Sequence, residues 1–341
     1  MRFGLGQFTL QIPPWDDRTH AELYADTVDL VARADDVGFD SVWLAEHHAA
    51  SDGYNPALLP MLAAFAARTE RIELGTAVML APFHHPLRVA EDAAVVANIA
   101  GGRLNLGLGL GWAPEEYRMF GVDSKGRGKR LAEFAQVLRA AWTQERFSFH
   151  GDFYDYDDIA VMPKPPSAPR LWLGGMVDAA LERAARHGDG YFPSSVTGID
   201  GLVERAEAIM RFREKVGADR PFGFGAFVPV GLGDDADLAW TSIRDGVLHI
   251  RGSYLLWAQG ERDVTGARDA VAAYEDQTRQ GCVVGTPAEV ADRIGPVMER
   301  LEALGFDQVF FSAILAPPGT PAAQGTEAVE RYARDVIGAL R

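Results

Sequence analysis

The sequence predicts an α/β fold in which eight parallel strands close into a (β/α)8 barrel of the TIM type. The first observation is alternation: eight short apolar segments suited to buried strands are each followed by a segment with helical periodicity. Parallel neighbours in a sheet need crossover connections of this kind. The second observation is that no linker with a composition shift divides the chain, which favours one barrel domain over residues 1–341 against a doubly wound open sheet in two domains.

Each predicted strand ends where glycine, proline or polar residues interrupt an apolar run. The predicted strands span residues 2–10, 40–48, 72–80, 103–110, 170–175, 189–195, 222–232 and 307–313. The predicted helices span residues 20–37, 56–68, 86–100, 129–143, 178–187, 199–216 and 287–305, with a last helix near the C-terminus. The pairs Thr19/Glu22 and Thr286/Glu289 have the spacing of capping boxes, so each marks the start of a helix.

Two segments interrupt the alternation. Residues 145–169, after the fourth strand, are rich in aromatic residues, aspartate and proline and predict an inserted hairpin. Residues 234–284, after the seventh strand, lack clear periodicity and predict a long irregular insertion. This insertion could close over the barrel mouth as a lid; the alternative is a surface excursion without a role.

The bulk composition excludes several classes of partner. The formal net charge is -15 and no basic cluster stands against it, so neither nucleic acid nor an anionic membrane is an expected partner. Cys282 is the only cysteine, which excludes an internal disulfide and favours a cytoplasmic protein. The first ten residues read as a strand rather than a signal peptide, and no apolar run is long enough to cross a bilayer.

The segment DSVWLAEHH, residues 40–48, carries the most direct chemical signal. Its apolar run ends in Glu46, His47 and His48, at the strand end where barrel enzymes place their active sites. Histidine exchanges protons near neutral pH, so acid–base chemistry is expected here. Because consecutive strand residues point to opposite faces, the two histidines do not easily share an ion, and no metal site is predicted. The alternative is a strand end held by structural hydrogen bonds.

Glycines gather at two other predicted strand ends. The run from Gly107 to Gly111 matches neither a Rossmann nor a P-loop spacing, and no G-x-S-x-G nucleophile elbow occurs. Gly174 and Gly175 precede the helix that begins at Asp178, where free N–H groups suit a phosphate. Ordinary turn formation would explain the same two glycines.

Four segments together resemble the bacterial luciferase-like flavin monooxygenases: DSVWLAEHH, GTAVMLAPFHHPLRVAED, GRLNLGLGLGWAPEEYRMFG and VVGTPAEVADRI. The N-terminal half, with MRFG and then a Q-x-P-P sequence, resembles the luciferase α subunit most. The resemblance implies a barrel with a closing insertion after strand seven. It also implies reduced FMN from a separate flavin reductase, a flavin peroxide formed with oxygen, and a small organic substrate.

The resemblance also assigns roles to single positions. His47 falls at the family's catalytic histidine, Glu116 near an acidic residue beside the flavin, and Glu46 next to the histidine. Gly109 takes the place of a reactive cysteine, and the family's non-proline cis peptide falls at Ala77–Val78. The implied cofactor-binding residues are Thr76, Ala77, Gly109, Leu110, Gly174, Gly175, Met176 and Val177.

Departures from luciferase leave alternatives open. Leu110 replaces an arginine that binds phosphate, and Met176 and Val177 replace a Glu-Ser pair, so backbone N–H groups would hold the phosphate with help from Arg170 or Arg183. A sister branch uses a deazaflavin (coenzyme F420) for hydride transfer without oxygen, and a few relatives only bind flavin. The alanine- and valine-rich helices at residues 56–68 and 86–100 predict a homodimer. Neither the substrate nor light emission follows from the sequence.

Overall fold

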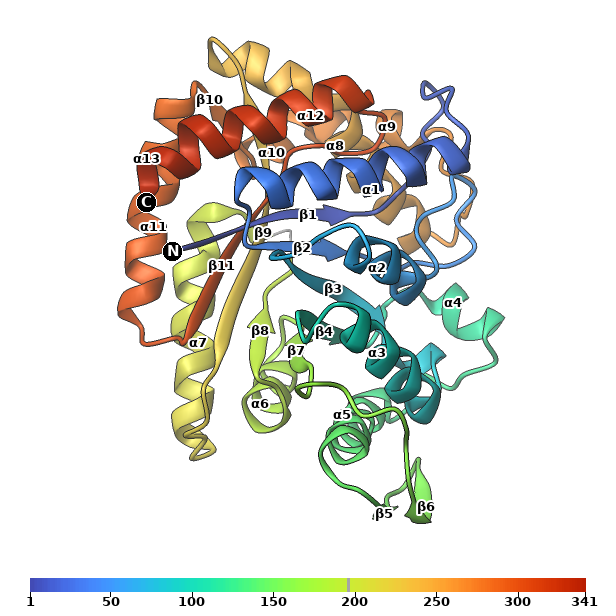
Figure 1. Ribbon diagram of the computed structural model, residues 1–341. Coiled ribbons are helices and arrows are strands. Elements are labelled where there is room, and N and C mark those ends of the chain that lie inside the picture. Colours follow the sequence, from blue (N-terminus) through green and yellow to red (C-terminus); the bar gives the residue numbers. More distant parts are fainter. Residues whose placement is uncertain (195–196) are drawn as a thin grey trace.

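The computed structural model describes residues 1–194 and 197–341 and confirms the predicted (β/α)8 barrel (Figure 1). Eight parallel strands pair in the order β9–β11–β1–β2–β3–β4–β7–β8, and a further β8–β9 pairing closes the ring. The barrel strands are β1 (Arg2–Phe8), β2 (Ser41–Leu44), β3 (Glu73–Leu80), β4 (Leu104–Gly109), β7 (Arg170–Gly174), β8 (Gly190–Phe192), β9 (Gly223–Leu232) and β11 (Gln308–Ile314).

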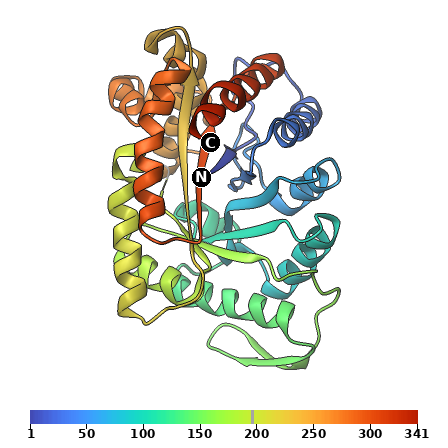
Figure 2. The same cartoon turned by 60° about the vertical axis from the view of Figure 1, so that its left-hand side comes forward.

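Helices surround the barrel, and both chain termini lie close together on one side of it in both views (Figures 1 and 2). The connecting helices are α1 (His20–Val37), α2 (Leu58–Ala66), η1 (Ala81–Phe83), α3 (Pro86–Ile99), α4 (Pro114–Met119), α5 (Arg127–Thr143), α6 (Asp178–His187), η3 (Ile199–Gly201), α7 (Leu202–Lys215), α11 (Pro287–Ala303), α12 (Ala322–Arg331), η5 (Tyr332–Ile337) and α13 (Gly338–Leu340). Both predicted capping boxes are confirmed, at the starts of α1 and α11. Among the described residues, no helix combines the length and apolarity needed to span a bilayer.

Large aromatic side chains fill the barrel interior beneath its mouth. Trp43, Trp172, Phe192, Phe227 and Phe310 pack together there with Ala77 and Ile314. Glycines on the strands leave the space these rings occupy. A Cβ at residue 75 would lie 2.1 Å from the Trp43 ring, and one at residue 223 would lie 2.3 Å from the Trp172 ring. The barrel interior is therefore a packed core.

The predicted hairpin after the fourth strand is confirmed. Strands β5 (Phe147–His150) and β6 (Asp155–Ile159) pair antiparallel. The hairpin extends from the outer side of the barrel below α5 (Figure 1). It therefore lies apart from the barrel mouth.

The insertion after the seventh strand is real, but its predicted irregular character is wrong. It begins with a long helix, α8 (Ala236–Ala258), followed by α9 (Ala267–Ala270), η4 (Ala272–Tyr274), α10 (Glu275–Gln280) and β10 (Val283–Gly285). Two glycines inside α8 obscured the helical signal. They permit close packing: a Cβ at Gly246 would lie 2.5 Å from the Pro318 oxygen, and one at Gly252 would lie 1.7 Å from the Ala267 oxygen.

Further details differ from the prediction. Strand β2 ends at Leu44 rather than at residue 48, so Glu46, His47 and His48 follow the strand. The short helix α4 was not predicted, and it carries Glu116. Strand β8 ends at Phe192 rather than at residue 195, which lies outside the described residues. The ends of the insertion meet where Gly233 N–H donates to the Gly285 oxygen at 3.1 Å.

Candidate functional site

A cavity of about 610 Å³ opens at the carboxyl ends of the barrel strands, which is a size typical of small-molecule sites. It combines an apolar floor, a glycine-rich wall and a small number of polar side chains. The lining residues are Gln7, Ala45, Glu46, His47, Tyr54, Ala77, Val78, Leu80, Gly109, Leu110, Gly111, Trp112, Arg127, Gly174, Gly175, Met176, Val177, Ala180, Arg183, Phe192, Pro193, Ser194, Phe227 and Tyr254. Most of the predicted site residues are therefore brought together here.

His47 lines this cavity and is oriented by Glu116, which lies behind it. The Nδ1 atom of His47 is 3.0 Å from Oε1 of Glu116, and the His48 N–H donates to the same oxygen at 2.8 Å. Burial alone would raise the pKa of Glu116, but the hydrogen bond and charge of His47, with the His48 N–H and Arg262, lower it. An ionised Glu116 places the Nδ1 proton toward itself and leaves Nε2 for the cavity.

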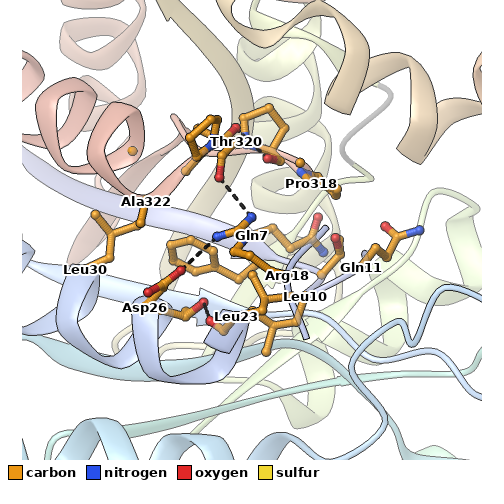
Figure 3. Close-up of a pocket in the computed structure, with 18 residues that line it drawn as sticks. Gln7, Leu10, Gln11, Arg18, Leu23, Asp26, Leu30, Pro318, Thr320 and Ala322 are labelled. Carbon is orange, nitrogen blue, oxygen red and sulfur yellow. Dashed lines mark hydrogen bonds and ion pairs between the residues drawn. The ribbon is translucent and has the colours of Figure 1, made fainter. Parts of the chain in front are cut away.

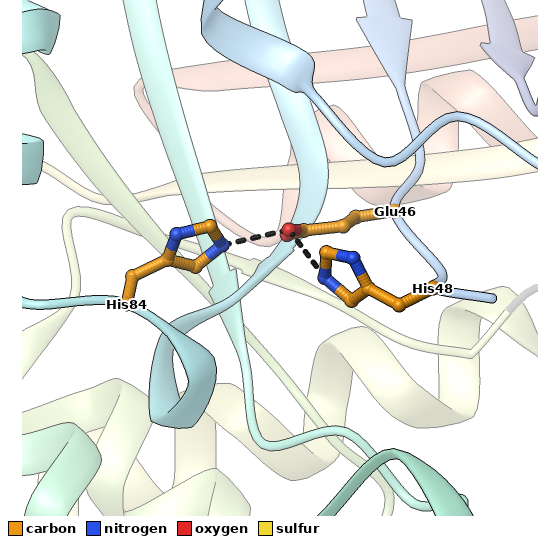
Figure 4. A group of neighbouring side chains, drawn as sticks. All are labelled: Glu46, His48 and His84. Carbon is orange, nitrogen blue, oxygen red and sulfur yellow. Dashed lines mark hydrogen bonds and ion pairs between the residues drawn. The ribbon is translucent and has the colours of Figure 1, made fainter. Parts of the chain in front are cut away.

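Glu46 belongs to a second polar cluster beside the first (Figure 4). Its Oε1 atom lies 2.7 Å from Nε2 of His84 and 2.9 Å from Nε2 of His48, while Oε2 accepts the Leu80 N–H at 2.6 Å. Burial opposes ionisation, yet the hydrogen bonds and charges of both histidines lower the pKa of Glu46 to about 2. Burial also opposes the charged form of His84, but Glu46 raises the pKa of its imidazole.

This cluster corrects one step of the metal argument. Glu46, His47 and His48 follow β2 rather than lying on it, so strand alternation does not govern them: His47 contacts Glu116, whereas Glu46 and His48 contact each other. With His84 they bring three ligand atoms within 4.8 Å of one another. The 2.7 Å separation from His84 is that of a hydrogen bond, whereas the 2.9 Å approach of the His48 Nε2 is an ion-pair contact without hydrogen-bond geometry. With the Leu80 N–H, Glu46 uses both of its oxygens on protein partners. The predicted catalytic role of Glu46 stays a prediction, and its contacts suit a structural support.

The cavity floor is formed where β3 approaches β4. The Ala77–Val78 peptide bond is cis, as the resemblance predicted. A Cβ at Gly109 would lie 2.4 Å from Cγ2 of Val78. The glycine therefore makes room for the Val78 side chain of β3, and not only for a ligand. Thr76 is fully buried and donates to the Gly107 oxygen at 2.7 Å. Its hydroxyl is therefore turned into the wall and Thr76 does not line the cavity, so its predicted part in cofactor binding stays a prediction.

The predicted phosphate turn forms one end of the cavity. Gly174 to Val177 lead into α6, whose first turn has no side-chain cap. Gly175 has a φ of 139°, and a Cβ there would lie 2.5 Å from Cβ of Ala180, so both the backbone and the packing require glycine. The uncapped N–H groups at this helix start suit an anion.

Two arginines line the same end of the cavity. Burial lowers the pKa of Arg183, and the charge of Arg127 lowers it further, so the two guanidinium groups are close enough to repel. Within residues 1–194 and 197–341, neither forms an ion pair with a carboxylate; Arg127 donates to the Gly111 oxygen at 3.2 Å. An anion placed between them would relieve this repulsion.

Arg170, the other suggested phosphate ligand, is excluded by its position. It is the first residue of β7, at the opposite end of the barrel, and its guanidinium binds both carboxylate oxygens of Asp307. Arg127 was missed because the sequence placed it just before a predicted helix, without a motif. Arg183, suggested as help for the phosphate, does line the cavity, and its phosphate role stays a prediction.

Three aromatic residues at the other end were also missed as site residues. Tyr54, Trp112 and Tyr254 line the cavity around His47, with ring centroids 4.9, 6.1 and 5.4 Å from its imidazole. They come from the β2 loop, the β4 loop and α8, so the insertion does contribute to the barrel mouth. These three residues lie far apart in the sequence, and no motif predicts that they share one site.

Arg262, in the loop after α8, anchors the insertion to this region. Its guanidinium donates to the His48 oxygen, lies 3.7 Å from Oε1 of Glu116 and sits over the Trp257 ring at 5.1 Å. A lid-like role for residues 234–284 stays a prediction. The contacts of Arg262 show that the loop after α8 packs behind His47.

A second, much smaller cavity of about 50 Å³ lies between β1, α1 and the segment before α12 (Figure 3). Arg18 and Asp26 are charged residues of its lining; Arg18 donates to Asp26 at 3.2 Å and to the Thr320 oxygen at 3.0 Å, and also pairs with Asp16. This cavity has room for little more than water, and its arginine is already paired. It carries no separate functional assignment.

Comparison with known proteins identifies relatives along the whole barrel. The family model for luciferase-like monooxygenases matches residues 5–308. The chain is similar to a 4-hydroxyprotoasukamycin monooxygenase from Streptomyces nodosus subsp. asukaensis, with 28% identity over 89% of this chain and 84% of that protein. It is also similar to the oxygenase component of a flavin-dependent trigonelline monooxygenase from Acinetobacter baylyi, with 26% identity over 87% and 85% of the two chains.

Other relatives are named for the use of coenzyme F420. An F420-dependent glucose-6-phosphate dehydrogenase from Amycolatopsis mediterranei is 31% identical over 53% of this chain and 56% of its own length. Among solved structures, the monooxygenase RslO1 from Streptomyces bottropensis superimposes with a TM-score of 0.82 over 100% of both chains at 23% identity, which supports the shared fold.

Proposed function

Because the chain belongs to the luciferase-like monooxygenase family, we propose that it is the oxygenase of a two-component system, which takes reduced FMN from a separate reductase and uses oxygen to oxidise a small organic substrate. The observation that carries this proposal is the layout of one cavity. A buried histidine–carboxylate pair lies at one end, and two arginines without carboxylate partners among the described residues lie at the other. Reduced flavin, when bound, supplies the activation of oxygen.

The residues present fit a flavin mononucleotide. The uncapped start of α6 with Arg127 and Arg183 suits its phosphate, and these side chains compensate for the leucine at position 110 and for Met176 and Val177. The floor at Ala77, Val78 and Gly109 suits the ring system, because it presents backbone and small apolar groups.

His47 is the proposed acid–base residue. With Nδ1 held by an ionised Glu116, its Nε2 can accept a proton from a group in the cavity and return it. Glu116 itself does not line the cavity, so we assign it to positioning and charge stabilisation rather than to direct contact with cofactor or substrate.

A deazaflavin-dependent hydride transfer is the second candidate, because F420-dependent enzymes are among the relatives. The two functions differ in ligand and in oxygen use. The deciding test compares the quenching of FMN fluorescence and of F420 fluorescence on titration with the protein, followed by oxygen uptake with enzymatically reduced FMN. Tighter FMN binding and product-coupled oxygen uptake support the monooxygenase; preferential F420 binding with no oxygen uptake contradicts it.

A flavin binder without turnover is the weakest candidate. A storage protein has no use for the His47–Glu116 pair, and burying a carboxylate without purpose costs stability.

We also propose a homodimer, because α3 exposes the apolar Val95 and Ile99 on its outer face. A cytoplasmic location is proposed from the single free, buried Cys282.

A further inference from the structure

We propose that the aromatic end of the cavity is the substrate subsite and that it selects a neutral, planar aromatic molecule bearing a phenol or carbonyl oxygen. This inference rests on the proposed function, since it assumes that the arginine end is taken by the cofactor phosphate. It names a class of substrate, which the sequence left open.

The first argument, for a planar ligand, comes from the shape of the subsite. Tyr54, Trp112 and Tyr254 surround His47 on several sides, and the Trp112 and Tyr254 rings meet edge to face at 6.0 Å. Trp257 closes the back, 4.8 Å from the His47 ring. Rigid aromatic walls favour a flat ligand, because rings gain from stacked and edge-to-face contacts that a flexible alkyl chain does not make. The surrounded group is the proposed acid–base residue, so a bound ring would lie beside the reacting centre.

The second argument, for a neutral ligand, comes from the charges around the subsite. An aromatic box can also bind a quaternary ammonium ion through cation–π contacts. Here Arg262 lies behind the box rather than in it: it sits at 5.1 Å over the ring of Trp257, which does not line the cavity, and lies 3.7 Å from Glu116. The carboxylates nearest the box are already paired, Glu116 with His47 and Arg262 and Glu46 with His84. A cation would therefore lose its water here without meeting an unpaired charge, which disfavours it. An anionic ligand finds its matching charges only at the far end, beside Arg127 and Arg183.

The third argument, for an oxygen atom on the ligand, comes from the two tyrosine hydroxyls. The Tyr54 and Tyr254 oxygens are 3.0 Å apart, and in the part of the chain that the structure describes they have no second partner. Burial raises the pKa of both phenols, so both stay protonated at neutral pH. Two phenols hold two protons, and their mutual hydrogen bond uses one. The other proton is free to donate to an oxygen of the ligand.

Isothermal titration calorimetry with four probes of similar size tests the proposal on the full chain, with and without FMN. The probes are 2-naphthol, naphthalene, N-methylquinolinium and decanal. We expect 2-naphthol to bind tightest, and N-methylquinolinium to bind at least about tenfold more weakly. Tighter binding of N-methylquinolinium would overturn the charge assignment, and tighter binding of decanal would overturn the planar class.

The double variant Tyr54→Phe/Tyr254→Phe keeps both rings and removes both hydroxyls. It should weaken 2-naphthol binding by roughly fivefold to tenfold and leave naphthalene within about twofold of wild type. Equal 2-naphthol affinity in wild type and double variant would refute the donor role. Tyr274→Phe, on an exposed part of the same insertion, is the matched control and should change neither affinity.

FMN binding, followed separately by fluorescence quenching, distinguishes the two levels of the proposal. If FMN fails to bind wild type, the proposed cofactor is contradicted, while calorimetry on the cofactor-free protein still decides the aromatic subsite. If FMN binds and none of the aromatic probes does, the subsite assignment alone is wrong.

Discussion

Nδ1 of His47 lies 3.0 Å from Oε1 of Glu116, which joins the end of β2 to a short helix 69 positions later in the chain. The contact is buried at both ends, with side-chain exposures of 6% and 0%. Its chemical consequence is that one imidazole nitrogen is fixed by a carboxylate and the other is left for the cavity. The same Glu116 oxygen accepts the His48 N–H, so the pair cannot rotate freely.

The first prediction concerns this pair. His47→Ala should leave FMN binding nearly intact but lower product formation by about 100-fold or more, with a larger share of the oxygen released as hydrogen peroxide. Glu116→Gln should give a smaller loss and change the pH profile, because the imidazole is no longer held by a charge. Oxygen uptake, peroxide and product are measured together. His85→Ala, a change at an exposed histidine, is the control. If His47→Ala leaves the ratio of product formed to oxygen consumed unchanged, His47 is not the acid–base residue.

The second prediction concerns stability around Glu46. Its pKa falls from 4.5 to about 2 in the folded protein, so its contribution is complete above about pH 4.5 and is lost as the pH falls toward 2. The pKa of His84 is raised above 6.5, so its contribution is complete below that value and is lost as the pH rises through the folded pKa. The cluster therefore stabilises most between these limits.

Urea denaturation against pH measures both effects. Glu46→Gln should lower the free energy of unfolding by about 2–3 kcal/mol near pH 5.5, because it leaves buried donors without their charged partner. The loss should shrink as the pH falls toward 2. His84→Gln should cost less, and His85→Gln should cost nothing measurable. A pH-independent effect of Glu46→Gln would contradict the ionised carboxylate.

The fold was predictable because its signals are local. Apolar strands, capping boxes at Thr19 and Thr286 and the hairpin composition each depend on a few neighbouring residues. The helix α8 was missed because Gly246 and Gly252 weaken local propensity, and their reason lies in the distant Pro318 and Ala267 backbones. Tertiary contact outweighed local preference there.

The site was predictable only where motif and strand end coincide. His47 and the glycine turn at residues 174–175 were found in this way. Tyr54, Trp112 and Tyr254 were not, because three separate connections bring them together only after the barrel closes. Arg127 and Arg262 show the same limit, since each reaches the site region from a distant part of the chain and neither belongs to a sequence motif.

The third prediction tests the arginine end. Arg127→Ala and Arg183→Ala should each weaken FMN binding by about tenfold to a hundredfold, and riboflavin, which lacks the phosphate, should bind equally well to all variants. Fluorescence quenching with the two flavins gives both affinities. Arg186→Ala, on the same helix but paired with Glu182 at the surface, is the control. Parallel losses for riboflavin and FMN would show that the arginines support the fold rather than bind phosphate.

The fourth prediction tests the homodimer. Val95 and Ile99 lie one helical turn apart on α3, with exposures of 46% and 49%. The double change Val95→Glu/Ile99→Glu should convert a dimer to a monomer in light scattering at micromolar concentration, because buried like charges oppose association. Leu238→Glu, at an equally exposed apolar position on α8, should leave the mass unchanged. A monomeric wild type would refute the dimer directly.

The last prediction concerns how firmly the insertion is docked. Gly252 lies inside α8 against the next segment, where an added Cβ would stand 1.7 Å from the Ala267 oxygen. Gly252→Ala should therefore force α8 and α9 apart and cost about 2–3 kcal/mol of unfolding free energy. Gly266→Ala is the matched change, because nothing lies within 4 Å of its added Cβ, and it should be neutral or stabilise by up to about 1 kcal/mol. Limited proteolysis should show faster cleavage between residues 259 and 266 in the first variant alone. Equal stability of the two variants would mean that α8 and α9 do not pack as closely as the structure has them.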